Sequence, residues 1–170
     1  MNVKILGAIM LICGCGGVGL SMAAAYRREE RMLRQLSAAI DLMCNELRQR
    51  LTPLPELCQI ASQGCSGAMA RFFLDLSTGL QEQIAPDAPL CMLLVIKRSS
   101  KLPERVKTIL EQLRPSMGRF DLEGQLKGLG AAKRRCQDEL EYLGRDKDQR
   151  LRSYQTLGLC AGIALAILFL

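Results

Sequence analysis

The sequence opens with an uncharged stretch, Ile5–Tyr26 (ILGAIMLICGCGGVGLSMAAAY), which follows Lys4 and runs directly into Arg27-Arg28-Glu29-Glu30-Arg31. A helix of about 20 apolar residues is long enough to cross a lipid bilayer. The stretch therefore predicts a transmembrane helix over residues 3–26. Lysine and arginine beside a membrane segment tend to stay in the cytoplasm. The arginines after this stretch accordingly predict that the N-terminus lies outside and that the chain enters the cytoplasm at Arg27.

Two other interpretations of this stretch stay open. Ala23-Ala24-Ala25 resembles the cleavage site of a signal peptide, and Ile12-Cys13-Gly14-Cys15 loosely resembles a lipoprotein signal. The arginines downstream argue against export, so we favour the membrane anchor. Gly19 and Ala23 lie four residues apart within it. They are either a face on which another helix packs or the glycine and alanine common in membrane helices.

A second uncharged segment, residues 153–170, ends the sequence. As a helix it would be about 27 Å long, which is enough for the hydrocarbon core of a bilayer. Four basic residues precede it, which predicts that residues 27–152 form a cytoplasmic domain and that the C-terminus lies outside. A face of small residues predicts helix packing within this segment, against the first anchor or a neighbouring subunit: Gly158, Gly162 and Ala166.

The residues between the two segments have a helical pattern. Five apolar residues spaced 3, 4, 3 and 4 apart continue the first helix, with Leu51 next in the series: Leu33, Leu36, Ile40, Met43 and Leu47. Thr52 is expected to cap the next helix, with Pro53 at its first position. Four further segments are predicted to be helical: 53–62, 69–80, 103–113 and 122–143. The apolar run Leu90–Ile96 could be a strand or a helix by period alone, and its helical neighbours favour a helix.

The predicted fold is therefore all-α, a cytoplasmic helical bundle flanked by N- and C-terminal transmembrane helices. The formal net charge is +6, but aromatic residues make up only 4% of the chain, so it lacks the stacking residues of a single-strand nucleic-acid binder. We expect no nucleic-acid partner. Eight cysteines occur without a CxxC pair. In a reducing cytoplasm they are expected to pack as small apolar residues, whereas an exported chain would form disulfides.

The sequence offers little catalytic chemistry. Histidine, the commonest general base and metal ligand, is absent, and no P-loop motif occurs. Carboxylates cluster at Glu29-Glu30, Asp138-Glu139 and Glu141, but each cluster lies beside arginine or lysine. A solvated, ion-paired helix face is the favoured interpretation of these clusters. We expect a non-enzymatic protein with no cofactor and no metal.

Five short stretches, in this order, together resemble one protein family, the stage III sporulation protein AB family. They are Lys4-Ile-Leu-Gly-Ala8, Leu51-Thr-Pro-Leu54, Phe72-Phe73, Met117-Gly-Arg-Phe-Asp121-Leu-Glu-Gly-Gln125 and Tyr154-Gln-Thr-Leu-Gly158. The fourth is similar to the family pattern LGxxDxxxQ, with methionine in place of leucine. The resemblance covers both ends of the chain and the spacing between them, and it is weakest between Pro86 and Pro103.

The resemblance implies a required component of the complex that links mother cell and forespore in sporulating bacteria, in the mother-cell membrane facing the forespore. It also implies similarity to the inner-membrane platform proteins of type II secretion and type IV pilus machines. The implied partners are a cytoplasmic secretion-type ATPase, the stage III sporulation protein AA, and other channel proteins, with a homo-oligomer also possible. An envelope protein with an exported helical domain is the alternative.

Candidate residues for partner contact or for structure are Thr52, Pro53, Gly118, Asp121 and Gln125. Asp121 and Gln125 are four residues apart, so on a helix they share a face. Asp121 is expected either to cap the last helix or to contact a partner together with Gln125, and the cap is the favoured role.

Overall fold

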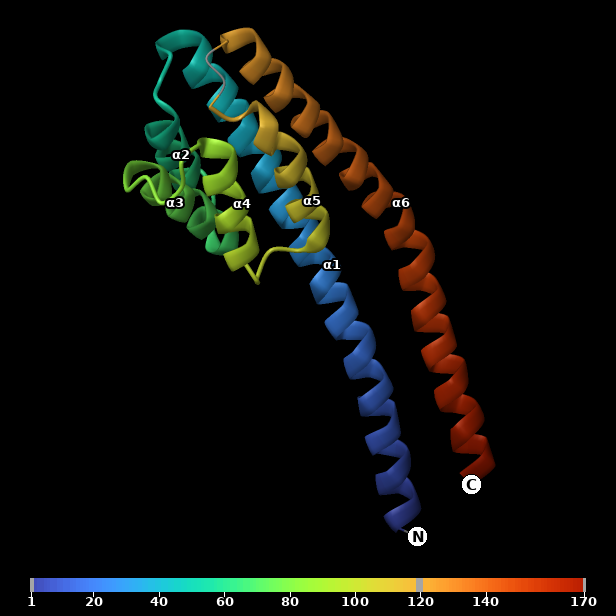
Figure 1. Cartoon of the computed structure of the whole chain (residues 1–170). Coiled ribbons are helices and arrows are strands. Elements are labelled where there is room, and N and C mark those ends of the chain that lie inside the picture. The colour runs from blue at the N-terminus through green and yellow to red at the C-terminus, as the bar shows by residue number, and fades with distance from the viewer. Residues whose placement is uncertain (1, 119–120, 170) are drawn as a thin grey trace. The chain divides into compact units, whose positions relative to one another are not determined.

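The computed structural model describes the backbone of residues 2–118 and 121–169, and the side chains of residues 24–118 and 121–145. Within these residues every regular element is helical, which confirms the all-α prediction (Figure 1). The elements are α1 (Asn2–Arg50), α2 (Leu54–Gln63), α3 (Gly67–Gln81), α4 (Ala88–Arg98), α5 (Glu104–Leu113), the 3₁₀ helix η1 (Arg114–Ser116) and α6 (Leu122–Phe169).

The chain divides into two units. The central unit is Glu29–Leu140, and the terminal unit combines Met1–Arg28 with Glu141–Leu170. The long helices α1 and α6 each contribute to both units, whereas α2 to α5 and η1 belong to the central unit alone.

The segments predicted to cross a membrane, residues 3–26 and 153–170, lie almost entirely outside the described side chains. Among the residues that are described, no helix combines the length and the apolar character that a membrane span requires. The predicted packing residues of the two segments are also outside the described side chains: Gly19, Ala23, Gly158, Gly162 and Ala166.

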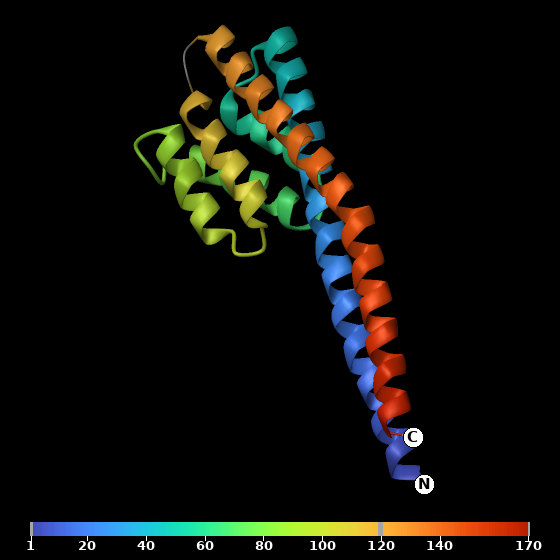
Figure 2. The same cartoon turned by 90° about the vertical axis from the view of Figure 1, so that its right-hand side faces the viewer.

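The apolar stripe of α1 is the spine of the central unit. All five of its predicted members are buried, from Leu33 to Leu47. Figures 1 and 2 both show the short helices α2 to α5 gathered on one side of this part of α1. Leu51 departs from the expected series: its side chain is 66% exposed. The reason is that α1 ends at Arg50, and Leu51 has a φ of +52°, which turns the chain out of the helix.

Helices α2 and α3 are joined by the short connection Gly64–Ser66, pack against each other and bury one face each. The rings of Phe72 and Phe73 meet edge to face with centroids 5.4 Å apart. Ser77, which is also buried, donates a hydrogen bond of 2.7 Å from Oγ to the carbonyl oxygen of Pro55. This bond links α3 to the first turn of α2.

The apolar run Leu90–Ile96 is helical, as its neighbours had favoured. It belongs to α4, which begins where the Asp87 side chain accepts a hydrogen bond of 2.7 Å from Leu90 N–H. Helix α4 packs closely on α3 at Gly79. An ideal β-carbon on Gly79 would lie 2.9 Å from Ile84 Cδ1 and 3.0 Å from Cys91 Sγ, so a larger residue there would push these side chains aside.

Helix α5 presents one apolar face to the core and is followed at once by η1 and then by α6. The last predicted helix has a heptad-like apolar register that includes Leu129 and Cys136, and both residues are buried in α6. Lys133 occupies one step of that register, and its Nζ donates a hydrogen bond of 2.6 Å to Asp41 of α1. The ion pair explains how a lysine is accommodated on the packed side of this helix.

The five cysteines with described side chains are all free, and three of them are buried: Cys58, Cys91 and Cys136. Burial raises the pKa of Cys58 and of Cys136 to about 12, and that of Cys65 to about 11. These thiols therefore stay protonated at neutral pH and pack as small apolar groups, as expected for a reduced chain.

Candidate partner-docking site

Residues from distant parts of the sequence meet at the end of the central unit where α1 finishes and α6 begins. Figures 1 and 2 both place the C-terminal end of α1 beside the N-terminal end of α6. Gly118, just before α6, has a φ of +74°. An ideal β-carbon on Gly118 would lie 2.8 Å from Ala88 Cβ and 3.8 Å from Leu54 Cδ2. Glycine is needed here both for its backbone conformation and for the close approach of three elements.

We call this end the junction surface and define it by Leu51–Leu54, Gly118 and Asp121. It brings together four of the five candidate residues proposed from the sequence, and Gln125 follows Asp121 by one turn of α6. The Leu51-Thr-Pro-Leu54 stretch and the Met117–Gln125 stretch are thus neighbours in space, although more than sixty residues separate them in the sequence.

Thr52 is not the N-cap of α2, which corrects the expectation from the sequence. The cap is Pro53, whose carbonyl oxygen accepts a hydrogen bond of 2.9 Å from Leu57 N–H, and α2 begins at Leu54. The shift by one residue arises because Leu51 is used to leave α1. The Thr52 hydroxyl instead donates to Glu46 Oε2 at 3.4 Å, a contact back onto α1.

Asp121 has the geometry of an N-cap. Its Oδ2 accepts a hydrogen bond of 2.8 Å from Gly124 N–H, and its carbonyl oxygen accepts one of 3.2 Å from Gln125 N–H. An ideal β-carbon on Gly124 would lie 2.3 Å from Asp121 Oδ2, so a larger residue there would make the carboxylate shift. Asp121 is exposed and Gln125 is half-buried.

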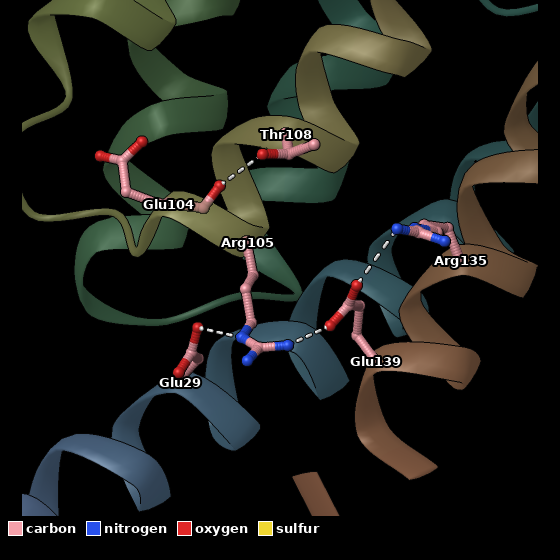
Figure 3. A network of polar contacts seen from close by, with 6 residues as sticks. All are labelled: Glu29, Glu104, Arg105, Thr108, Arg135 and Glu139. Atoms are coloured by element: carbon pink, nitrogen blue, oxygen red, sulfur yellow. Dashed lines mark hydrogen bonds and ion pairs between the residues drawn. The ribbon is translucent and has the colours of Figure 1, made fainter. Parts of the chain in front are cut away.

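A second cluster, which sequence reasoning did not find, lies at the other end of α5 (Figure 3). Arg105 Nε lies 3.4 Å from Glu29 Oε1 of α1, and Arg105 Nη1 donates to Glu139 Oε2 of α6 at 2.5 Å. Arg135 Nη2 approaches the other oxygen of Glu139 at 3.4 Å. Arg105 thus joins α1, α5 and α6 near the limits of the central unit, where both long helices pass into the terminal unit.

Four carboxylates of the acidic clusters pair with arginines: Glu29, Glu30, Glu139 and Glu141. Besides the Arg105 network, Glu30 pairs with Arg34 at 2.9 Å, and Glu141 pairs with Arg145. This confirms the ion-paired helix faces predicted from the sequence. Among the described residues, no group of histidine, cysteine or carboxylate side chains could hold a metal ion.

A sequence model of the family described as stage III sporulation protein AB matches residues 4–170. The chain belongs to the stage III sporulation protein AB family. A role in sporulation follows from membership of this family. The match includes both halves of the junction surface and the Arg105 network.

The stage III sporulation protein AB family is also represented among solved structures. A structure titled stage III sporulation protein AB superposes with a TM-score of 0.64 and is 19% identical in sequence. The alignment covers 72% of this chain and 98% of that chain. At this identity the likeness concerns the fold, and it agrees with the helical architecture described above. No curated protein matches the sequence.

Proposed function

We propose that the chain is a non-enzymatic platform subunit of the stage III sporulation machinery. In this proposal residues 3–26 and 153–170 anchor it in the mother-cell membrane, and residues 27–152 form a cytoplasmic domain that docks a secretion-type ATPase like the stage III sporulation protein AA. The observation that carries the proposal is the family match over residues 4–170, which includes both apolar ends as well as the helical centre.

The chemistry of the described residues supports a binding role. Glu29, Glu30, Glu139 and Glu141 pair with arginines, and burial keeps the thiols of Cys58 and Cys136 protonated. A catalytic carboxylate or thiolate needs a group that is free to change its charge or to attack a substrate. These side chains instead stabilise the helical unit, which presents the exposed positions of the junction surface for contact with other proteins.

Co-purification tests the proposal directly. The full chain, tagged and expressed at its native level during sporulation, is extracted from membranes after mild crosslinking. We expect the ATPase and other stage III sporulation proteins to be recovered with it. Recovery of the chain alone, from cells in which those proteins are present, would contradict the platform role.

Thiol labelling tests which side of the membrane the central unit occupies. Cys58 and Cys91 are buried and poorly suited to labelling, so exposed positions are better: Asn45→Cys on α1 and Thr78→Cys on α3. A membrane-impermeant maleimide should label these variants more than the unmodified chain only after the cells are permeabilised. Labelling in intact cells would support the alternative, an envelope protein with an exported helical domain.

A further inference from the structure

Leu51 is an unusual residue for its place in the fold. It occupies the first position after α1 with a φ of +52°, in the left-handed region that glycine most often fills at the end of a helix. A side chain with a β-carbon costs free energy in this conformation. Its side chain is 66% exposed, so little packing offsets that cost. Glycine would end α1 with less strain, and the fold therefore does not explain leucine here.

The other exposed large aliphatic side chains lack this combination. Among the described residues these are Leu74, Ile84 and Leu90, which are 50%, 40% and 38% exposed, and none of them has a positive φ. Isolated apolar residues on a surface are common and need no explanation. Backbone strain and exposure at the same residue are a stronger indication of a functional site, because strained positions concentrate at such sites.

Two arginines precede Leu51 in the sequence, and the nearby carboxylate of Glu46 accepts the hydrogen bond of Thr52. Arg48 and Arg50 are exposed in the last turn of α1, and neither forms an ion pair with another described residue. Both complement the helix dipole at this end, yet their guanidinium groups remain open to a partner. Pro53, also exposed, follows two residues later. The result is an apolar projection with a basic border, which we call the Leu51 knob: Arg48, Arg50, Leu51 and Pro53.

We propose that the Leu51 knob is the part of the junction surface that contacts the ATPase, where it inserts into an apolar pocket bordered by aspartate and glutamate. This inference rests on the proposed function, because it names a surface for the partner inferred there. The acidic border follows from charge complementarity, which guides association and orients partners. In the complex, Leu51 would be buried in the pocket of the partner and act as the anchor. The arginines at the rim would form charge-assisted hydrogen bonds with carboxylates of the partner.

The test uses the full-length chain in detergent or nanodiscs and measures binding of the purified ATPase from the same organism. Leu51→Gly removes the knob and keeps a residue suited to the left-handed conformation, so we expect it to fold at least as stably and to bind at least tenfold more weakly. Leu74→Ser is the matched control, and its binding should equal that of the wild type. The double variant Arg48→Glu, Arg50→Glu should also bind more weakly than the wild type, and the difference should be largest at low salt.

The outcomes are distinguishable. If the wild type binds and Leu51→Gly binds equally well, the knob is not the contact, although the platform proposal stands. The same conclusion follows if Leu74→Ser weakens binding as much as Leu51→Gly, since the effect is then not local. If the wild-type chain does not bind the ATPase at all, the proposed function fails and the knob fails with it. Tenfold weaker binding by Leu51→Gly alone, with unchanged thermal unfolding, supports the inference.

Discussion

Gly128 of α6 lies against the side chain of Ser116 in η1 with no space for a β-carbon between them. An ideal β-carbon on Gly128 would overlap both Cβ and Oγ of Ser116. Because Ser116 Cβ is fixed to the backbone, the overlap cannot be relieved by rotation of the side chain alone. The contact sets how closely α6 approaches the connection that precedes it.

Replacement of Gly128 by alanine should therefore destabilise the protein. Alanine favours the helix by about 1 kcal/mol relative to glycine, but overpacking at a closed contact costs about 1–3 kcal/mol. We expect a net loss, measured as the free energy of unfolding in urea. Adding Ser116→Gly should restore stability to the double variant. Gly130→Ala is the control, because nothing lies near a β-carbon at that position, and it should stabilise.

Arg105→Gln should weaken the junction of α1, α5 and α6. It removes one cation from two carboxylates that are largely covered, since Glu29 and Glu139 side chains are 19% and 17% exposed. Three partly covered charges interact more strongly than a surface pair, so we expect a loss of about 1–2 kcal/mol of unfolding free energy. Lys127→Gln should have no measurable effect, because its pair with Glu123 is almost fully exposed. Equal effects of the two substitutions would contradict this account.

Ser77→Ala should loosen α3 from α2. The substitution deletes the bond from Ser77 Oγ to the Pro55 carbonyl, so the expected loss is about 1 kcal/mol. Thr78→Ala is the comparison, because Thr78 is exposed on the same helix, and it should change stability by less than about 0.5 kcal/mol. Thermal unfolding of the two variants, followed by circular dichroism, provides the measurement.

Stability should fall at alkaline pH because of Cys58. Burial, with a smaller effect of the neighbouring Cys91, raises the pKa of this thiol from 9.0 to about 12 in the folded chain. The folded state therefore holds the proton more tightly than the unfolded state. The resulting stabilisation is complete below pH 9 and is lost between pH 9 and 12, at about 1.4 kcal/mol per pH unit. Cys58→Ala should have a correspondingly smaller slope of unfolding free energy from pH 9 to 10.5. Parallel slopes would show that Cys58 is accessible to base.

Helix period predicted most of the architecture because each helix has one apolar face. The stripe from Leu33 to Leu47 is buried, as its spacing predicted. Leu90–Ile96 is helical, as predicted from its helical neighbours. The shift of the α2 cap from Thr52 to Pro53 was not predictable. It depends on the left-handed conformation of Leu51, and leucine gives no sign of that conformation in a sequence.

The contents of the junction surface were partly predicted and its assembly was not. The candidate residues from Thr52 to Gln125 could be named individually, but their meeting at Gly118 depends on the packing of α4 and η1. Arg105 was missed because an arginine near the start of an amphipathic helix resembles any solvated residue. Its partner Glu139 is 34 residues away, and short-range spacing rules for ion pairs do not reach that far.

The pairing of Asp41 with Lys133 bears on how the protein is made. The two residues are 92 positions apart, and the helices that carry them enclose all the short helices of the central unit in the sequence. Closing such a long loop has an entropic cost, so the contact between α1 and α6 forms more slowly than the local helices. The ribosome must release the chain beyond Lys133 before α6 can pack against α1. Until then the apolar stripe of α1 stays partly uncovered, and it is the kind of surface that chaperones shield during synthesis.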